Sequence, residues 1–455
     1  MSERATRIAV VGGGLAGMTA ALACGDAGCE VSLFEARPRL GGATFSTELQ
    51  GLAVDNGQHV FLRCCTSYLA FLDRIGARER TVLQPRLSIP VIGPDGRTSR
   101  LRRAPLPAPL HLASSLLRYA PLSLGERLRL GPAALRLKSV RLDDPGTDDT
   151  SFADWLRAQG QSERAIALFW DLVTRPTLNL PAADASLALA AKVFQTGLLS
   201  EPSAADVGWA AVPLQHVHAE PAERALEKVG ASVWKRARVQ RIELAANGAV
   251  SALWLGGERA SFDAVVLAAP HDDAANLLPE QTGLDAAGLV SLGTSPIVNL
   301  HAVWDRKIFP HDFAAAVGSP LEWIFDRSAA AGLERGQYLA VSLSAAERWL
   351  GASSDALRRT FEPEFRRLFP AAREAVLERF FTTFEPAATF RGAPGTRRLR
   401  PRAETRVPNL FLAGAWTDTG WPATMEGAVR SGVAAARAAL LGLGRTHGLP
   451  PEIAA

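Results

Sequence analysis

The stretch RIAVVGGGLAGMTAALACGDAGCEVSLFE, residues 7–35, decides the fold of this chain. RIAVV is a short apolar run typical of a buried strand, and a G-x-G-x-x-G turn follows it directly. A helix-like segment and a second strand pattern come next, and that strand ends at Glu35, eighteen residues after Gly17. A strand, a glycine turn, a helix and a strand ending in an acid together predict a dinucleotide-binding β-α-β unit.

The glycine spacing matches the chemistry of a pyrophosphate site. Gly12 allows the tight turn, Gly14 lets the backbone approach the phosphates, and Gly17 lets the helix pack closely on the strand. The helix N-terminus supplies free N–H groups, and Glu35 can accept hydrogen bonds from ribose hydroxyls. The residues predicted to hold the dinucleotide are Gly12, Gly14, Leu15, Ala16, Gly17 and Glu35. The alternative is a glycine-rich turn in another kind of α/β protein.

The composition is that of a globular protein. The 455 residues are 47% hydrophobic and 21% charged, which excludes a disordered chain, a collagen and a coiled coil. No uncharged apolar run of about 18 residues occurs, so a membrane-spanning helix is not expected. The four cysteines are Cys24, Cys29, Cys64 and Cys65. They have neither disulfide nor metal-ligand spacing, so we interpret them as reduced thiols of a cytosolic protein, with a Cys64–Cys65 redox pair as the alternative.

Further strand and helix patterns divide the chain into two parts. Strand patterns occur at 232–234, 238–244, 262–270 and 409–414, and a helix pattern covers 424–441. They predict a nucleotide-binding domain built from residues 1–85, 216–289 and 401–445. The intervening residues 86–215 and 290–400 would form the substrate domain. His216 and His218 have no third partner at metal-ligand spacing, so we predict no metal site.

Positive charge is concentrated in one segment. Residues 97–141 contain ten Arg or Lys and one acid, Glu126, whereas the whole chain has a net charge of only +4. Leucine clusters alternate with the basic residues, which predicts an amphipathic element resting on anionic lipid headgroups. The alternative is an ordinary solvated face of the substrate domain. The segment has no aromatic platform for bases, so nucleic-acid binding is not expected.

The chain resembles the flavin amine oxidase and phytoene desaturase superfamily. The resemblance rests on VVGGGLAG (10–17), FEARPRLGG (34–42), VLAAP (266–270) and LAGAWTDTGWPATMEGAVRSG (412–432). Within it, DNGQHVFL (55–62), TLNLP (177–181), WIFDR (323–327) and WPATMEGAVRSG are most similar to the hydroxysqualene dehydroxylases. The resemblance implies an α/β fold: a discontinuous Rossmann-type (GR2-like) FAD domain, an inserted α+β substrate domain, and a helical part that faces the membrane.

The resemblance also implies FAD, bound without a covalent link, and a set of residues around it. Beyond the glycine turn these are Ala36, Arg37, Gly41, Gly42, Gly57, Gln58, His59, Val239, Ala269, Gly414, Asp418, Thr424 and Met425. A helix N-terminus aimed at the flavin would stabilise its anionic reduced form. Two positions depart from the family: Ala43 replaces an arginine and Ala415 replaces an acid. Both changes would weaken FAD binding unless Arg37, Arg39 or Asp418 compensates.

The implied reaction is the reductive removal of the hydroxyl of hydroxysqualene, which yields squalene for hopanoid synthesis. His59 is the first candidate for the proton donor and Asp326 the second, while Asn179 would position the hydroxyl. The alternatives are that His59 only hydrogen-bonds the flavin or backbone and that Asp326 forms an ordinary salt bridge. Thr424 stands where amine oxidases place an aromatic residue, which argues against an amine substrate.

Other functions and partners follow from the same resemblance. A carotenoid-precursor desaturase or isomerase is the alternative enzyme, and a flavin-stabilised carrier protein is the alternative without chemistry. We expect a long isoprenoid substrate, a membrane surface and contact with the upstream squalene-pathway enzymes as partners. The protein would be cytoplasmic and peripherally attached to the inner face of the membrane.

Overall fold

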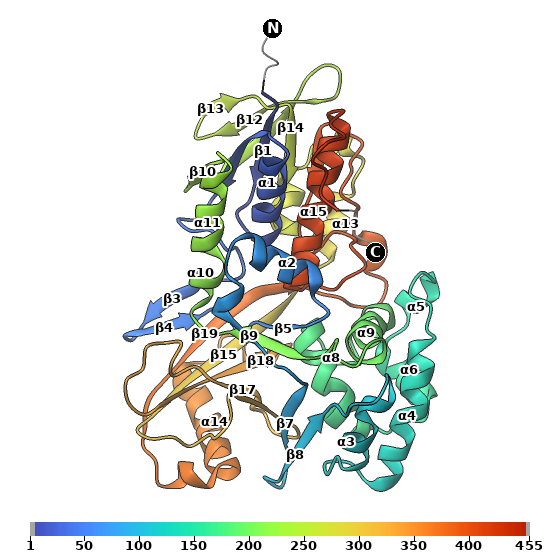
Figure 1. Cartoon of the computed structure of the whole chain (residues 1–455), viewed down its shortest axis with the longest axis vertical. Helices are drawn as coiled ribbons and strands as arrows, with labels where there is room; N and C mark the ends of the chain where they lie inside the picture. The colour runs from blue at the N-terminus through green and yellow to red at the C-terminus, as the bar shows by residue number, and fades with distance from the viewer. Residues whose placement is uncertain (1–4, 452–455) are drawn as a thin grey trace.

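A computed structural model describes residues 5–451 and contains a five-stranded parallel sheet at one end of its long axis (Figure 1). The strand order is β10–β2–β1–β14–β20. The strands are β1 (Arg7–Val11), β2 (Glu30–Glu35), β10 (Ser232–Lys235), β14 (Ala264–Leu267) and β20 (Leu410–Leu412). Segments far apart in the sequence therefore assemble one sheet, as the discontinuous Rossmann-type prediction requires.

The central strands read as continuous apolar runs because both faces of the sheet are covered. Every residue of β14 is buried. Helices α1 (Leu15–Asp26) and α15 (Met425–Gly442) lie side by side against this sheet (Figure 1). A Cβ on Gly432 would collide with the Ala16 carbonyl, so the close crossing of the two helices depends on that glycine.

A seven-stranded sheet forms the opposite, broader end of the molecule (Figure 1). Its order is β19–β15–β18–β17–β16–β7–β8, and every pair is antiparallel except β7 with β16. The strands are β7 (Ser88–Ile92), β8 (Thr98–Arg102), β15 (Thr294–Trp304), β16 (Phe313–Ala316), β17 (Glu322–Asp326), β18 (Gln337–Ser344) and β19 (Leu377–Phe390). Helix α14 (Ser354–Leu368) packs Phe361 and Phe365 into the core of this end.

A helical layer lies beside the seven-stranded sheet. It comprises α3 (Ala113–Leu117), α4 (Leu124–Lys138), α5 (Pro145–Asp149), α6 (Phe152–Ala158), α7 (Glu163–Ala165), α8 (Asp171–Leu178) and α9 (Leu187–Phe194). π-helical turns at Ile166–Trp170 and Gln195–Leu199 adjoin α8 and α9. The rings of Phe152, Trp170 and Phe194 contact one another in its core.

Besides these elements, residues 5–451 form three small sheets and five further α-helices. The sheets are β3 (Ser46–Leu49) with β4 (Leu52–Asp55); β5 (Val60–Leu62), β9 (Val207–Ala210) and β6 (Thr81–Leu83); and β11 (Val239–Leu244), β12 (Val250–Leu255) and β13 (Glu258–Ala260). The helices are α2 (Thr66–Arg74), α10 (Leu214–Val217), α11 (Ala219–Lys228), α12 (His271–Leu277) and α13 (Ala286–Ser291). Strand β9 pairs with β5 and β6, so residues 207–210 join strands from the first 85 residues. The predicted domain boundaries stay a proposal.

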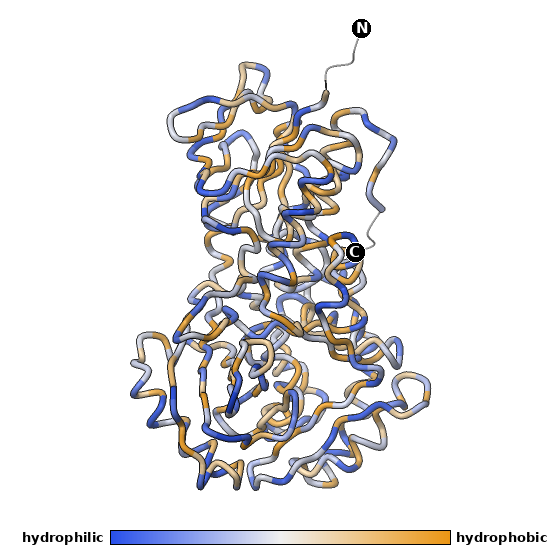
Figure 2. Tube along the Cα trace, turned by 60° about the vertical axis from the view of Figure 1, so that its left-hand side comes forward, coloured by the Kyte–Doolittle hydropathy of each residue, from blue (hydrophilic) through white to orange (hydrophobic). Residues whose placement is uncertain are grey.

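Apolar residues gather inside both ends, while the loops are largely hydrophilic (Figure 2). The α/β prediction with a discontinuous Rossmann-type domain is confirmed. Across residues 5–451, no helix combines the length and apolarity needed to cross a bilayer.

Candidate active site

The N-terminus of α1 forms the first half of the candidate site. Gly12 has φ +112°, and a Cβ there would lie 2.6 Å from the Ala268 carbonyl oxygen. A Cβ on Gly17 would collide with the Gly12 carbonyl. The helix begins after Gly14 with no side-chain cap, and its first residues Leu15 and Ala16 are buried. The first N–H groups of a helix have no intrahelical partner, so this buried end fits the pyrophosphate of a dinucleotide.

A second glycine loop packs against the first. The Gly41 amide donates to the Gly13 carbonyl over 2.9 Å. Gly42 has φ +56°, and a Cβ there would lie 2.8 Å from the Gly14 Cα. Arg39 donates to the Gly42 carbonyl over 3.2 Å, and its guanidinium carbon lies 3.5 Å from the centre of the Phe45 ring. The two loops therefore form one cradle that side chains at these glycines would fill.

Glu35 is held by backbone amides at the edge of this cradle. Its two carboxylate oxygens accept one hydrogen bond each, from the Gly13 and Arg37 amides, both over 2.7 Å. Each oxygen keeps lone pairs for a ribose hydroxyl. The Glu35 carbonyl accepts from the Ala237 amide over 2.9 Å, which brings Val239 close to the end of β2. Ala36 and Arg37 are exposed beside it.

The loop from Gly414 to Met425 forms the second half. Gly414 has φ +144°, and its amide donates to the Ser431 hydroxyl over 2.8 Å. The Trp416 ring N–H donates to the Ala269 carbonyl over 3.0 Å, which joins this loop to the end of β14. The Thr424 hydroxyl caps α15 by accepting from the Gly427 amide over 3.1 Å. The loop and the α15 N-terminus, where Met425 begins the helix, therefore have fixed positions.

Arg400, which the sequence interpretation missed, anchors the same loop. Its buried guanidinium donates to the Thr417 carbonyl over 2.6 Å and the Trp421 carbonyl over 2.7 Å. Burial lowers the pKa of Arg400 to about 10. Asp418 lies in this loop and approaches Arg397 at 3.8 Å. Only the tertiary structure reveals this role, because an arginine that binds backbone carbonyl groups leaves no motif in the sequence.

A small pocket lies where the loop after β4 meets β9 and β17. The residues lining it are Asp55, Gln58, His59, Trp209, Ala210, Leu214, Phe325 and Arg327. Asp55 and Arg327 form a nearly fully buried ion pair with 2.8 Å between Oδ2 and Nη2. Burial lowers the pKa of His59, although the Asp55 carboxylate acts in the opposite direction. The imidazole is therefore neutral near pH 7 and can donate a hydrogen bond, but it does not store a proton.

The structure does not bring Asp326 into this pocket. Its carboxylate accepts hydrogen bonds from the Ser328 amide over 3.0 Å and the Gln337 side chain over 2.7 Å. Successive residues of a strand point to opposite faces, so Arg327 enters the pocket while Asp326 faces away. The alternation in WIFDR was a usable signal, but the sequence did not show which face met the pocket. The predicted salt bridge of Asp326 is also not among those of residues 5–451.

Asn179 has a structural position rather than a place in the pocket. It ends α8 with φ +53°, a conformation that Asn tolerates well. Its side-chain amide donates to the Ser295 carbonyl over 2.9 Å, and its Oδ1 accepts from the Ala345 amide over 2.8 Å. These bonds tie α8 to the seven-stranded sheet, so the geometry does not present this amide to a substrate hydroxyl.

Asn299 is a further buried residue that the sequence did not single out. It donates to the Asn56 carbonyl over 2.8 Å and accepts from the Ser342 hydroxyl over 2.7 Å. The Gln58 amide donates to the same hydroxyl over 3.4 Å. This network connects the Gly57–His59 loop to strands β15 and β18.

Aromatic rings line one side of the pocket. Trp209 and Phe313 have ring centroids 5.3 Å apart, and Phe313 also contacts Trp323 and Phe325. Leu87, Ala205 and Val207 complete this buried apolar cluster. The environment suits a hydrocarbon better than a charged substrate.

The remaining candidate groups have ordinary structural partners. His218 is buried and pairs with the Tyr68 hydroxyl at 2.7 Å, and burial lowers its pKa to about 3. His216 contacts Glu220 at 2.9 Å. All four cysteines are free thiols. Within residues 5–451 no three His, Cys, Asp or Glu side chains are grouped to hold a metal ion. That the protein binds no metal stays a prediction.

Comparison with known proteins agrees with this geometry. The family model of flavin-containing amine oxidoreductases matches residues 15–440. The chain belongs to this family and is an FAD-dependent oxidoreductase. A solved structure with the same fold, cyclohexylamine oxidase from Brevibacterium oxydans, superimposes with a TM-score of 0.69 at 19% identity, covering 97% of this chain and all of the other.

The curated relatives narrow the resemblance. Hydroxysqualene dehydroxylase of Rhodopseudomonas palustris is 30% identical over 438 residues, which cover 94% of this chain and 96% of the relative. Zeta-carotene desaturase of Synechocystis is 25% identical over 483 residues, covering 95% and 97%. The similarity to hydroxysqualene dehydroxylases that the motifs indicated is confirmed.

Proposed function

We propose that this chain removes the allylic hydroxyl of hydroxysqualene reductively and forms squalene. The observation that carries the proposal is the pocket beside His59, which is electrically balanced and walled by aromatic rings. Its one carboxylate, Asp55, is neutralised by Arg327. This lining offers no net charge to bind an ionic substrate, and its aromatic wall suits a hydrocarbon better.

The proposed reaction balances as an alcohol, a proton and a hydride giving a hydrocarbon and water. Bound reduced FAD supplies the hydride. The chain's own part is to exclude water with Trp209 and Phe325, because water would recapture an allylic cation. We propose that His59 donates a hydrogen bond to the departing hydroxyl. Its role as the proton donor stays a prediction, and its lowered pKa favours the neutral form.

Amine oxidation fits this site poorly. A cationic amine is stabilised by aromatic faces close to the flavin, and Thr424 occupies the position before Met425-Glu426. The Thr424 hydroxyl is committed to capping α15. Asp55 cannot attract a cation either, because Arg327 already pairs with it.

A second candidate is the oxidative desaturation of a carotenoid precursor. It is favoured by the similarity to zeta-carotene desaturase, which extends over 95% of this chain. The same apolar wall would suit that substrate. The two reactions differ in the direction of electron flow, since dehydroxylation consumes reduced flavin and desaturation produces it.

This difference gives the test. Anaerobically reduced protein is mixed with hydroxysqualene, and the flavin spectrum and extracted lipids are followed together. We expect reoxidation of the flavin with one squalene formed per flavin. Oxidised protein mixed with phytoene under the same conditions is the comparison. Flavin reduction by phytoene with no squalene from hydroxysqualene would replace the first proposal with the second.

We also propose that the protein attaches peripherally to a membrane through α4. The leucines 124, 128 and 135 of this helix are 63%, 59% and 55% exposed. Their spacing places them on one face, whereas Leu130, Ala133 and Leu137 are buried on the other. The exposed Arg129 and Lys138 flank the apolar face and complement anionic headgroups.

Vesicle sedimentation tests this attachment. Replacing Leu124 and Leu128 by Ser should weaken binding to vesicles about a hundredfold, because each leucine side chain that enters the bilayer contributes about 1.5 kcal/mol or more to the binding free energy. Val290→Ser with Leu441→Ser, at exposed positions on α13 and α15, is the matched control. Equal binding by both double variants would remove α4 as the attachment surface.

A further inference from the structure

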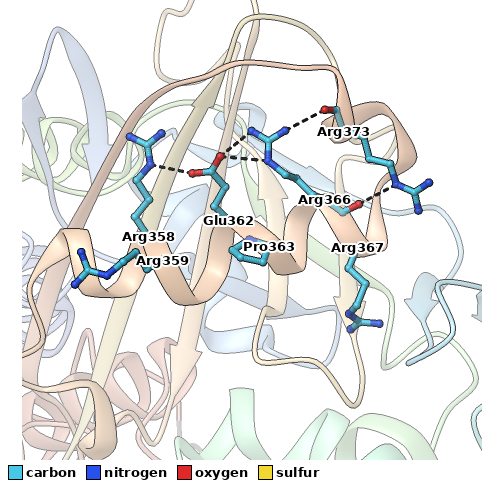
Figure 3. A pocket seen from close by; sticks show the side chains of 7 residues that line it. All are labelled: Arg358, Arg359, Glu362, Pro363, Arg366, Arg367 and Arg373. Carbon is cyan, nitrogen blue, oxygen red and sulfur yellow. Dashed lines mark hydrogen bonds and ion pairs between the residues drawn. The ribbon is translucent and has the colours of Figure 1, made fainter.

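Helix α14 has a pocket of about 630 Å³ on its outer surface, and arginines dominate its lining (Figure 3). Two rows with four-residue spacing run along this helix: Arg358, Glu362 and Arg366 in one, and Arg359, Pro363 and Arg367 in the other. Arg373 closes the pocket from the following turn. Among residues 5–451, the lining therefore contains five arginines and only one carboxylate, Glu362.

Part of this charge serves the fold. Glu362 pairs with Arg358 at 2.9 Å and with Arg366 at 2.7 Å (Figure 3). Arg366 also donates to the Ala372 carbonyl over 2.6 Å, which fixes the turn after α14. Arg367 pairs with Glu364 at 2.7 Å and donates to the Pro94 carbonyl over 2.6 Å. These three arginines are committed to the structure.

The other two arginines of the pocket, Arg359 and Arg373, are not held by ion pairs within the described residues 5–451. Arg359 forms no ion pair or hydrogen bond within residues 5–451, and it points away from Glu362 (Figure 3). Arg373 makes one long hydrogen bond of 3.4 Å through Nε, to the Arg366 carbonyl. Both side chains are exposed. Their guanidinium groups present forked donors that match the oxygens of a phosphate.

The position of the pocket indicates where that phosphate comes from. Figure 1 places α14, α3 and α4 at the same end of the long axis, opposite the N-terminus. The β7–β8 hairpin connects them: Pro94 in its turn contacts Arg367 of α14, and Ser99 of β8 accepts from the Ala120 amide just before α4. The arginine pocket and the exposed leucine face of α4 therefore lie at the same end of the molecule, with the β7–β8 hairpin between them.

We propose that the α14 pocket binds the phosphodiesters of anionic lipid headgroups, with Arg359 and Arg373 each contacting a headgroup at its own end of the pocket. This inference rests on the proposed membrane attachment and adds a second contact that orients the molecule on the bilayer. The leucine face supplies attachment independent of headgroup charge, and the pocket adds to the preference for anionic lipid that Arg129 and Lys138 of α4 contribute.

Two measurements on the FAD-loaded full-length protein test the inference. The first is sedimentation with vesicles of phosphatidylcholine, with and without phosphatidylglycerol. Arg359→Gln with Arg373→Gln should weaken binding to the anionic vesicles about 25-fold, since each arginine near an anionic surface contributes about fivefold. Binding to neutral vesicles should not change. Arg224→Gln with Arg402→Gln, two exposed arginines elsewhere, removes the same charge as a control.

The second measurement is calorimetric titration with a short-chain phosphatidylglycerol below its micelle concentration, compared with inorganic phosphate. Saturable binding of the soluble lipid that is lost in the Arg359/Arg373 variant is expected even if α4 does not insert, so the two proposals can fail separately. Equal losses in both arginine pairs would show a general charge effect and overturn the site. Tighter binding of inorganic phosphate would overturn the lipid assignment.

Discussion

Replacing Glu426 with Gln tests whether the Met-Glu-Gly-Ala segment clamps two helices together. Glu426 is 1% exposed, in the first turn of α15. Its carboxylate accepts from the Ser67 and Tyr68 amides over 3.2 and 2.7 Å, and so caps the N-terminus of α2. It also pairs with Arg430 at 2.7 Å. The variant keeps the size of the side chain but removes its charge and turns one oxygen into an NH₂ group.

The magnitude follows from the loss of this pair. Removing one partner of a buried ion pair costs about 3–5 kcal/mol, and Arg430 keeps its contact with the Trp421 ring, so we expect about 3 kcal/mol. Unfolding entropy is about 2.1 cal/mol/K per residue. For 455 residues it is therefore about 1 kcal/mol/K, and the Tm should fall by about 3 °C.

The assay is thermal unfolding of the apoprotein followed by circular dichroism, arranged as a double-mutant cycle with Arg430→Met. In the Arg430→Met background, Glu426→Gln should cost only the weakened amide contacts, about 1 kcal/mol. A Tm unchanged within about 1 °C, or an equal loss in both backgrounds, would refute the clamp.

Three further predictions concern the cradle, pH and the flavin loop. Gly42→Ala should lower the flavin-to-protein absorbance ratio of the purified protein, because its Cβ would lie 2.8 Å from the Gly14 Cα; Gly51→Ala, at φ +73° with nothing within 4 Å, is the control and should keep its flavin. Burial raises the pKa of Asp171 from 3.8 to about 6, because the folded protein favours the protonated carboxyl. The contribution of this group to the free energy of unfolding is therefore fully present below pH 3.8 and is lost as the pH rises through 6. Asp171→Asn should therefore match the wild type near pH 3.5 and exceed its free energy of unfolding by about 3 kcal/mol above pH 7; identical urea profiles at both pH values would contradict this. Arg400→Leu should weaken FAD binding in a fluorescence titration about tenfold or more, by freeing the carbonyls of Thr417 and Trp421 from charge-assisted bonds, whereas unchanged affinity would show that the loop holds its shape alone.

The sequence was informative where the fold depends on local rules. Parallel strands covered on both faces read as apolar runs, so β1 and β14 were predictable from RIAVV and AVVL. The helix over 424–441 began with a polar residue, and Thr424 is indeed the cap of α15. The glycines of the first turn were predictable because only a residue without a Cβ fits where two backbone segments approach this closely.

The sequence was less informative about which side chains meet. In WIFDR the choice between Asp326 and Arg327 depended on which face of β17 is turned toward β9, and no local pattern contains that information. Asn179 was interpreted as a polar group for the substrate, but its αL conformation and its bonds to Ser295 and Ala345 make it a helix terminator. Its partners lie 116 and 166 positions away along the chain.

Contacts between residues far apart along the chain also assemble the candidate site. The Gly57–His59 loop is fixed from the substrate side by Asn299 through the Asn56 carbonyl, and the strand before it by Arg327 through Asp55. The first contact spans 243 residues and the second 272. Both replace water around groups that are expensive to bury alone, so the loop is ordered only when the two ends of the molecule are packed together. One buried apolar cluster also spans both ends, because it contains Val11 and Leu267 of the five-stranded sheet together with Val91 and Ala315 of the seven-stranded sheet. The packing that orders the pocket therefore also contributes to both cores.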